Sequence, residues 1–119
     1  MSSLPAPKRG EIWLVRLDPV IGAEMGKTRP AVVVSSDAMG VLPAKLIVPL
    51  TAWNESFAGK AWHVRVEPDG SNNLDQIDSA DALQIRCIAI ERFIERLGRL
   101  SASLIEEVTA AIATVIEYQ

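Results

Sequence analysis

The stretch Lys27-Thr28-Arg29-Pro30-Ala31-Val32-Val33-Val34-Ser35-Ser36 decides how this chain folds. Residues 31–35 are uncharged, mostly β-branched and bounded by turn formers, which predicts a buried strand. Pro30 has a fixed φ and favours extended geometry at Arg29. The stretch therefore presents a guanidinium at the start of a rigid strand, which suits the binding of a phosphate or a carboxylate. A surface salt bridge at Arg29 is the simpler interpretation, and this stretch alone favours it.

Other segments have the pattern of strands, and they lie at 11–17, 45–50, 61–67, 81–90 and 93–100. Segment 61–67 alternates apolar and polar residues, which is typical of a half-exposed antiparallel strand. Pro49 cannot donate a backbone hydrogen bond, so it predicts a sheet edge or the end of its strand. The acidic segment 74–80 is expected to be irregular, and 90–93 to form a short helical turn.

The last segment predicts the one helix. Ser101 or Ser103 is the expected N-cap, and Ser103 with Glu106 matches a capping box. An apolar stripe at helical spacing, predicted to face a core or a partner, comprises Leu104, Val108, Ala111, Ile112, Val115 and Ile116. The whole pattern predicts a mainly β fold with helices, as a small, partly open antiparallel barrel or sandwich with a C-terminal α-helix.

Length and composition favour an ordinary globular protein. The 119 residues predict one domain over 1–119, with 1–7 as a frayed N-terminal tail. No apolar run approaches membrane-spanning length. Cys87 is the only cysteine, which fits a reducing cytoplasm, and one cysteine with one histidine cannot build a usual zinc site.

Charge is distributed unevenly along the chain. The net charge of −3 argues against general coating of nucleic acid. Residues 1–65 hold eight Lys and Arg against five acids, whereas residues 66–119 hold four Arg against ten acids. A basic front half can bind an anion locally, although with so few charges a chance asymmetry is as good an explanation.

One constellation has chemical promise. Thr51 directly follows the strand 45–50, and Arg29 lies at the start of the strand that follows it. If these strands are antiparallel neighbours, the two residues would lie close together. Glu24, in the polar loop 20–28, could pair with Arg29, act as a base, or be a solvated loop acid. In the second polar loop, 53–60, Trp53 could stack on a base, although loop packing is the commoner role.

Several motifs together resemble one known family. They are Arg9-Gly10-Glu11-Ile12-Trp13-Leu14-Val15, Leu17-Asp18-Pro19, Gly22-x-Glu24, Thr28-Arg29-Pro30-Ala31-Val32-Val33-Val34-Ser35, Val48-Pro49-Leu50-Thr51, Gln84-Ile85-Arg86 and Arg96-Leu97-Gly98-Arg99-Leu100-Ser101. In this order the chain resembles the MazF/PemK (Kid-like) toxin endoribonucleases of type II toxin–antitoxin systems.

The resemblance implies an SH3-like barrel that forms a homodimer. It implies metal-independent cleavage of single-stranded RNA at a short motif, without any cofactor. Arg29 and Thr51 match the catalytic Arg and Thr, and Glu24 matches the loop Glu. The reaction would be attack by the RNA's own 2′-hydroxyl, giving a 2′,3′-cyclic phosphate and a 5′-hydroxyl end. Arg is normally protonated, so Arg29 is assigned transition-state stabilisation first and acid–base work second.

The resemblance also assigns partners and contact residues. The candidate RNA-binding residues are Lys27, Thr28, Trp53, Asn54, Lys60 and His63, although on its pattern alone His63 is more simply a surface residue. Gln84 and Arg86 would be structural or at the dimer interface. A cognate antitoxin with an acidic flexible segment would fill the RNA groove and would provide the only link to DNA. The protein would act in the cytoplasm, with no membrane partner.

The chain departs from the family at one motif and leaves two alternatives. The usual Asp-Gln-Ile/Val-Arg-Thr reads Leu83-Gln84-Ile85-Arg86-Cys87 here, in a region that is structural or at the interface. The first alternative is a non-catalytic, gyrase-poisoning toxin of the CcdB-like kind, which residues 116–119 do not favour because they lack a tryptophan-type plug. The second is an RNA- or peptide-binding barrel without activity.

Overall fold

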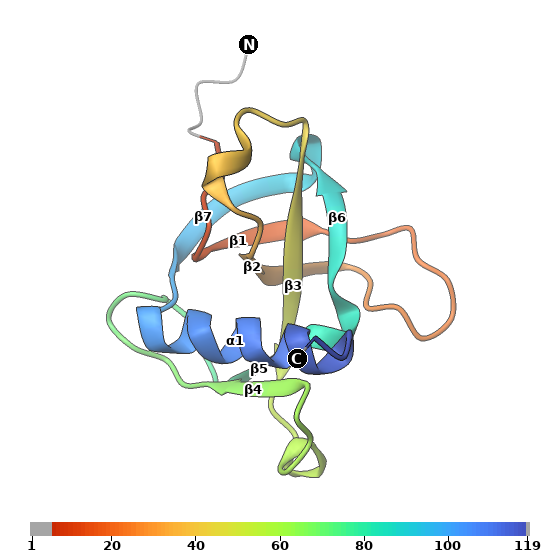
Figure 1. Ribbon diagram of the computed structural model, residues 1–119, viewed down its shortest axis with the longest axis vertical. Coiled ribbons are helices and arrows are strands. Elements are labelled where there is room, and N and C mark those ends of the chain that lie inside the picture. Colours follow the sequence, from red (N-terminus) through yellow and green to blue (C-terminus); the bar gives the residue numbers. More distant parts are fainter. Residues whose placement is uncertain (1–5, 119) are drawn as a thin grey trace.

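Figure 1 shows the computed structural model, which describes residues 6–118. The described strands are β1 (Glu11–Arg16), β2 (Thr28–Val33), β3 (Ala44–Ala52), β4 (His63–Val66), β5 (Asp78–Asp81), β6 (Arg86–Ala89) and β7 (Phe93–Arg99). The α-helix is α1 (Ala102–Val115), and short 3-10 turns lie at η1 (Asp37–Met39), η2 (Glu55–Phe57), η3 (Ala82–Gln84) and η4 (Ile90–Arg92). No helix in this range is long and apolar enough to cross a membrane.

The strands form one strongly curved antiparallel sheet. Their order is β4-β5-β3-β2-β1-β7, and β6 pairs with β3 beside this path. No pairing joins β4 to β7 within residues 6–118, so the barrel stays open between them. In Figure 1, α1 lies beside β4, and it also contacts η3. The expected small, partly open, SH3-like antiparallel barrel with a C-terminal helix is confirmed.

β3 is the central strand and contacts three others. It pairs with β2 along one side, and along the other with β6 up to Ile47 and then with β5 from Leu50. Pro49 lies in the interval between these two partners, so the prediction that it marks an edge or the strand's end is wrong. Proline is tolerated there because, on the side of β3 that pairs with β6 and β5, no ladder hydrogen bond forms at this position.

Strand pairing shifts two predicted boundaries. β2 begins at Thr28, three residues earlier than expected, because its pairing with β1 continues as far as Arg16 and Thr28. β3 continues to Ala52 because β5 pairs with its end. Arg29 and Thr51 therefore lie inside strands rather than just outside them, which fixes both backbones.

Three local predictions also need correction. Residues 78–81 form β5 instead of irregular structure, because β3 and β4 pair with them on either side and override their weak strand propensity. The extended segment predicted for 81–90 is interrupted by η3. Ser101 is the N-cap and accepts a hydrogen bond from the Leu104 amide, so the Ser103 capping box is wrong. The short turn expected near Ile90 is confirmed.

The apolar residues of the barrel wall form two core clusters, one on each face. The first lies beneath α1 and includes Val32 and Leu50. The second lies on the opposite face and includes Ala31, Val33 and Ile47. Successive side chains of a strand point to opposite faces, so each strand contributes to both clusters.

Much of the apolar stripe predicted for the helix packs against the first cluster. Val108 and Ala111 are buried, and Leu104, Ile112 and Val115 are partly buried. Ile116 is the exception, with 66% of its surface exposed. The stripe therefore packs against the core of this chain, which is the first of its two predicted roles, a core face or a partner surface.

The predicted frayed tail lies mostly outside the described residues, since it covers 1–7 and the structure describes 6 onward. Pro7 is buried, which contradicts fraying at that position. The next two amides explain the order, because Lys8 N donates to Glu11 Oε1 at 2.8 Å and Arg9 N donates to Asp37 Oδ1 at 3.0 Å.

Candidate active site

Arg29 is half-buried and its guanidinium is held by two hydrogen bonds. Nε donates to the Gly26 carbonyl at 2.9 Å, and Nη1 donates to Thr51 Oγ1 at 3.2 Å. A carbonyl from the preceding loop and a hydroxyl from the neighbouring strand thus fix the plane of the group. A guanidinium carries five N–H donors, so this arrangement leaves donors for an anion.

Thr51 lies across from Arg29 because of strand register. Ala31 pairs with Pro49, and two residues further along each strand lie Arg29 and Thr51. The Thr51 hydroxyl accepts from Arg29 and still has its own hydrogen to donate. The structure therefore brings together the two residues that the sequence singled out, and it does so on the face that carries the second core cluster.

Glu24 is not brought to Arg29. It is exposed, and its Oε1 accepts a hydrogen bond from the Ile21 amide at 2.7 Å within the same loop. No ion pair joins it to Arg29 among residues 6–118. Glu24 instead lines a cavity of about 360 Å³ together with Gln84 and Arg86. Its catalytic role stays a prediction that the present geometry does not support directly.

Gln84 and Arg86 hold the loop between β1 and β2, which projects from the barrel in Figure 1. Gln84 Oε1 accepts from the Met25 amide at 2.9 Å, and its Nε2 donates to the Ala23 carbonyl at 3.2 Å. Arg86 Nη1 donates to the Leu17 carbonyl at 3.2 Å. Both side chains thus brace the loop that supplies the Gly26 carbonyl to Arg29, a structural role within the chain itself.

Sequence reasoning missed a third residue at the base of this loop. Arg92 Nη1 donates to the Arg16 carbonyl at 3.1 Å and to the Asp18 carbonyl at 2.5 Å. Its long side chain reaches over the end of β1 from η4, a contact between residues 74 or more positions apart. No local pattern signals such a contact, because side-chain-to-carbonyl bonds leave no periodicity.

Lys27 and Thr28 lie at the exposed junction of this loop with β2. Lys27 has a φ of 66°, the left-handed region that residues with a Cβ seldom adopt. Its carbonyl accepts from the Leu17 amide at 2.8 Å, which closes the base of the loop. The ammonium and the Thr28 hydroxyl are thus displayed to solvent beside Arg29.

The segment between β3 and β4 is an aromatic cluster. The Trp53 ring meets Phe57 edge-on with centroids 5.7 Å apart, and Phe57 stacks on His63 at 3.8 Å with the planes 5° apart. Asn54 caps η2 by accepting from the Ser56 amide. Lys60 Nζ lies 5.9 Å from the centre of the Trp62 ring. Trp53, Asn54 and Lys60 of this segment and His63 at the start of β4, the four residues predicted here, therefore lie close to one another.

His63 is partly buried, not the plain surface residue that its pattern suggested. Its Nδ1 lies 2.8 Å from Ser79 Oγ, across the β4–β5 ladder. Desolvation by burial lowers the pKa of His63 below its ordinary value of 6.5, the nearby Asp81 carboxylate opposes this shift, and Lys60 adds to it. The imidazole is therefore mostly neutral at pH 7.

A larger cavity, of about 540 Å³, has both Arg29 and Thr51 in its lining. It is lined by the consecutive residues 28–30 and 50–52, so their alternating side chains cannot all point into it. It also contains Asp78, which is only 4% exposed and which sequence reasoning missed inside a segment expected to be irregular. Burial raises the pKa of Asp78 above its ordinary value of 3.8; a hydrogen bond from Gln76 opposes this, and Asp75 adds to it.

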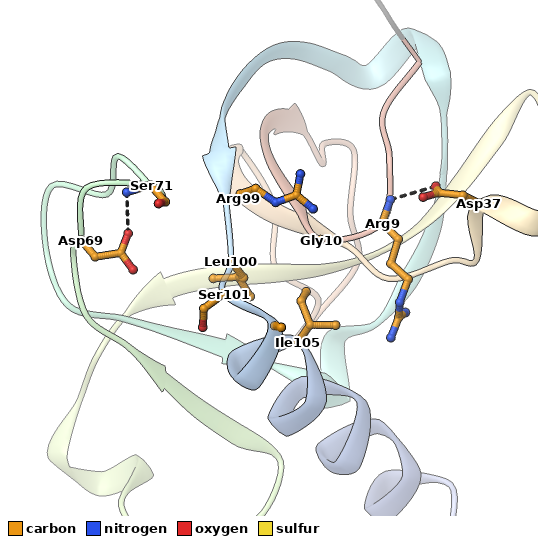
Figure 2. A pocket seen from close by; sticks show the side chains of 10 residues that line it. Arg9, Gly10, Asp37, Asp69, Ser71, Arg99, Leu100, Ser101 and Ile105 are labelled. Carbon is orange, nitrogen blue, oxygen red and sulfur yellow. Dashed lines mark hydrogen bonds between the residues drawn. The ribbon is translucent and has the colours of Figure 1, made fainter.

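Figure 2 shows a third cavity, of about 500 Å³, at the start of α1 and away from Arg29 and Thr51. Arg9 borders it, but its guanidinium is already bonded to the Val34 carbonyl and to Thr109 Oγ1. Asp37 and Asp69 add two carboxylates to the wall. Their charge makes this cavity less suited to an RNA phosphate than the surroundings of Arg29.

The chain is similar in sequence to known proteins. A family model described as PemK-like, MazF-like toxin of type II toxin-antitoxin system matches residues 8–116. The chain is 38% identical over 112 residues to the endoribonuclease MazF9 of Mycobacterium tuberculosis, which covers 88% of this chain and 92% of that protein.

Two solved structures have a similar fold. The crystal structure of MazF from Deinococcus radiodurans has a TM-score of 0.79 at 23% identity, covering 96% of this chain and 99% of that one. An endoribonuclease from Mycobacterial species in complex with its cognate antitoxin has a TM-score of 0.76 at 20% identity, covering 96% and 98%. At these identities, the two structures support the fold alone.

Proposed function

Because this chain belongs to the PemK-like, MazF-like toxin family of type II toxin-antitoxin systems, we propose that it is an endoribonuclease that cleaves single-stranded RNA at a short sequence motif. The observation that carries the proposal is the contact between Arg29 and Thr51, a fixed guanidinium and a hydroxyl that are both partly exposed. Cleavage of messenger RNA would arrest translation and growth. The proposal places the activity in the cytoplasm.

The proposed chemistry needs no nucleophile from the protein. The 2′-hydroxyl oxygen attacks the adjacent phosphorus and loses its proton, while the bond from phosphorus to the 5′-oxygen breaks and that oxygen gains a proton. Negative charge grows on the outer phosphate oxygens as this happens. Arg29 and Thr51 would donate hydrogen bonds to those oxygens, and a preorganised donor of this kind contributes roughly 3–4 kcal/mol to transition-state stabilisation. No metal or cofactor takes part in this scheme.

The guanidinium of Arg29 suits charge stabilisation better than proton transfer. Arginine stays protonated in proteins, so acid–base work is its secondary role in the proposal. The Gly26 carbonyl and the Thr51 hydroxyl fix its orientation before substrate arrives. Little reorganisation is then needed as charge develops, which is the basis of electrostatic preorganisation.

The RNA would extend from this site over both polar segments. Lys27 and Thr28 on one side offer a cation and a hydroxyl, and Trp53, Asn54, Lys60 and His63 on the other offer rings and polar groups. Aromatic rings stack on any base, so affinity does not require a particular sequence, whereas polar groups can select one. The two segments would therefore set the cleavage motif.

We further propose a cognate antitoxin as the regulatory partner. One similar structure is an endoribonuclease solved with its cognate antitoxin, which supports a partner of this kind. An acidic, flexible antitoxin segment would compete with RNA for the same cations and would order on binding. Binding to DNA would occur only through that antitoxin. The toxin itself would be a homodimer.

The test is incubation of the purified chain with synthetic single-stranded RNA in EDTA. We expect cleavage, with cyclic phosphate and 5′-hydroxyl ends, that Arg29→Ala and Thr51→Ala each reduce at least a hundredfold. Sequencing the 5′ ends of the products would give the motif. Unchanged cleavage by both variants would refute the site. Gyrase inhibition without RNA cleavage, or RNA binding without cleavage on long incubation, would refute the proposed activity.

A further inference from the structure

A row of polar side chains crosses four strands from the proposed reaction site. Arg29 of β2 is bonded to Thr51 of β3, Thr51 pairs in register with Ser79 of β5, and Ser79 pairs with Arg65 of β4. Residues directly opposite each other on neighbouring strands point to the same face. The row Arg29–Thr51–Ser79–Arg65 thus runs straight across the sheet on one face.

The neighbouring residues confirm which face this is. Leu50, Ala80 and Val64 each lie one position from a row member, and all three are buried in the core cluster beneath α1. Alternation along each strand then puts the row on the outer face. The bond between Ser79 Oγ and His63, another outward-facing residue of β4, agrees with this placement.

The row has a guanidinium at each end. Neighbouring strands lie about 4.8 Å apart, so three steps separate the backbones of Arg29 and Arg65 by about 14 Å along the sheet. Two hydroxyl-bearing residues, Thr51 and Ser79, lie between them. Two acids lie near the row: Glu67, which forms an ion pair with Arg65, and Asp81, which is 8% exposed and accepts a hydrogen bond from the Leu83 amide. The row itself holds two arginines and no acid, in a chain whose net charge is −3.

Arg65 is positioned but still accessible. Its Cζ lies 5.4 Å from the centre of the Trp53 ring, a cation–π contact that orients the guanidinium. Its side chain is 44% exposed, and its ion pair with Glu67 at 3.3 Å involves a carboxylate side chain that is 67% exposed. Exposed pairs of this kind contribute little to stability, so a phosphate could replace Glu67 readily.

We propose that Arg65, oriented by Trp53, is a second phosphate-binding subsite for single-stranded RNA, on one side of the bond cleaved at Arg29 and Thr51. The inference rests on the proposed function and adds the path that the RNA would follow, which crosses β5 and β4 toward the segment between β3 and β4. Because Arg65 lies well beyond the reacting phosphate, it contributes to binding of long substrates and not to the chemical step.

The experiment measures RNA affinity as a function of length. Fluorescence anisotropy is used with oligonucleotides built around the motif, made resistant to cleavage by a 2′-deoxy sugar at the cleaved position and extended stepwise on the 5′ or the 3′ side. We expect Arg65→Ala to raise Kd about tenfold for oligonucleotides extended on one side, and to leave the shortest ones unchanged. The slope of log Kd against the logarithm of the salt concentration should decrease in magnitude by about 0.7, which is the value for one phosphate contact on a single strand.

The matched control is Arg99→Ala, which removes the same charge from an exposed arginine bordering the cavity in Figure 2. It should change neither Kd nor the salt slope. Arg65→Lys keeps the charge but loses the contact of the guanidinium with the Trp53 ring, so it should keep the slope and recover only part of the affinity. On cleavable RNA, Arg65→Ala should raise KM for long substrates and leave kcat unchanged.

The outcomes separate this inference from the proposed function. Equal Kd and salt slope for Arg65→Ala and the control would overturn it, even if the chain cleaves RNA. If the wild-type chain cleaves no RNA, random-sequence oligonucleotides replace the motif series, and length-dependent loss of affinity at Arg65 would still support the subsite. An effect of Arg65→Ala on binding of a poly-glutamate peptide, with none on RNA, would assign the row to an acidic polypeptide and overturn the inference.

Discussion

Arg29 donates a hydrogen bond to the hydroxyl of Thr51 at 3.2 Å, although 22 positions separate them in the chain. Antiparallel register explains the contact, because the pairing of Ala31 with Pro49 continues outward to these two residues. The pairing of β2 with β3 stops at that pair. The side chains of Arg29 and Thr51 thus meet just beyond it, where Thr51 pairs on its other side with Ser79 of β5.

The hydroxyl of Thr51 should affect the rate of RNA cleavage more than the branched shape of its side chain does. Thr51→Ser keeps the oxygen that accepts from Arg29, so we expect RNA cleavage within about tenfold of wild type. Thr51→Val keeps the branched shape and removes the oxygen, and should reduce kcat by a factor of about a hundred or more. Rates measured at saturating RNA test this. Equal rates for the two variants would mean that the hydroxyl has no part in the reaction.

The amide of Gln84 should control the order of the loop at 23–25. Gln84→Ala removes the acceptor for the Met25 amide, so that amide should exchange with deuterium faster while amides of β3 do not. If the loop positions RNA, KM should rise more than kcat falls. Leu83→Ala, at a neighbouring side chain that is 60% exposed, is the control and should leave exchange unchanged. Unchanged protection of Met25 in Gln84→Ala would contradict the bracing role.

Stability should fall in mild acid because of His63. Its pKa is lowered in the folded state, mainly by burial, so the unfolded chain binds the proton more tightly. This contribution to stability is fully present above pH 6.5 and is lost as the pH falls through the folded-state pKa. Urea unfolding at a series of pH values should show this decline, and His63→Gln should reduce it. The same pH dependence in both proteins would contradict the prediction.

Asp78 should make the protein less stable as the pH rises, which is the opposite of the pH effect of His63. Its pKa is raised in the folded state, so its contribution to stability is fully present below pH 3.8 and is lost as the pH rises through the folded-state pKa. Asp78→Asn should therefore be more stable than wild type at pH 7, and the difference should shrink toward pH 4. Glu95→Gln, at an exposed carboxylate, controls for the change of net charge. A variant less stable than wild type at pH 7 would show that the carboxylate is needed there.

Gly98 should not tolerate a side chain. A Cβ at this position would lie 2.2 Å from the Ser71 carbonyl oxygen and 2.9 Å from the Asn72 carbonyl carbon, and backbone atoms cannot move aside easily. We expect Gly98→Ala to reduce the free energy of unfolding by about 2–3 kcal/mol. Gly70→Ala is the matched control, because nothing lies within 4 Å of its Cβ. Equal unfolding midpoints for the two variants would show that β7 and the 69–73 turn can separate without loss.

Much of the fold could be predicted from local pattern. The alternation around Val64 and the helical stripe around Val108 each identified their element, because one buried face leaves a regular period in the sequence. β5 was missed because Asp78, Ser79 and Asp81 have no apolar period. It becomes a strand through its two neighbours, which is a tertiary effect that no window of sequence contains.

The candidate site divides in the same way. The chemistry of Arg29 and Thr51 and their positions at strand ends were readable from the sequence, since proline and β-branched residues mark those strands. The bracing of the loop by Gln84 and Arg92 was not, because these bonds join segments more than 50 positions apart. Glu24 shows the converse, since nearness in sequence to Arg29 did not bring it into contact.

The sequence by itself determined the strands other than β5, the helix, the two polar segments and the residue types available for chemistry. Only the tertiary structure decided that Arg29, Thr51, Ser79 and Arg65 share one face in a single row. The physical reason is register. Side-chain direction alternates with a period of two, so the face of each residue follows from its own strand, but which residues stand opposite one another depends on how the strands pair.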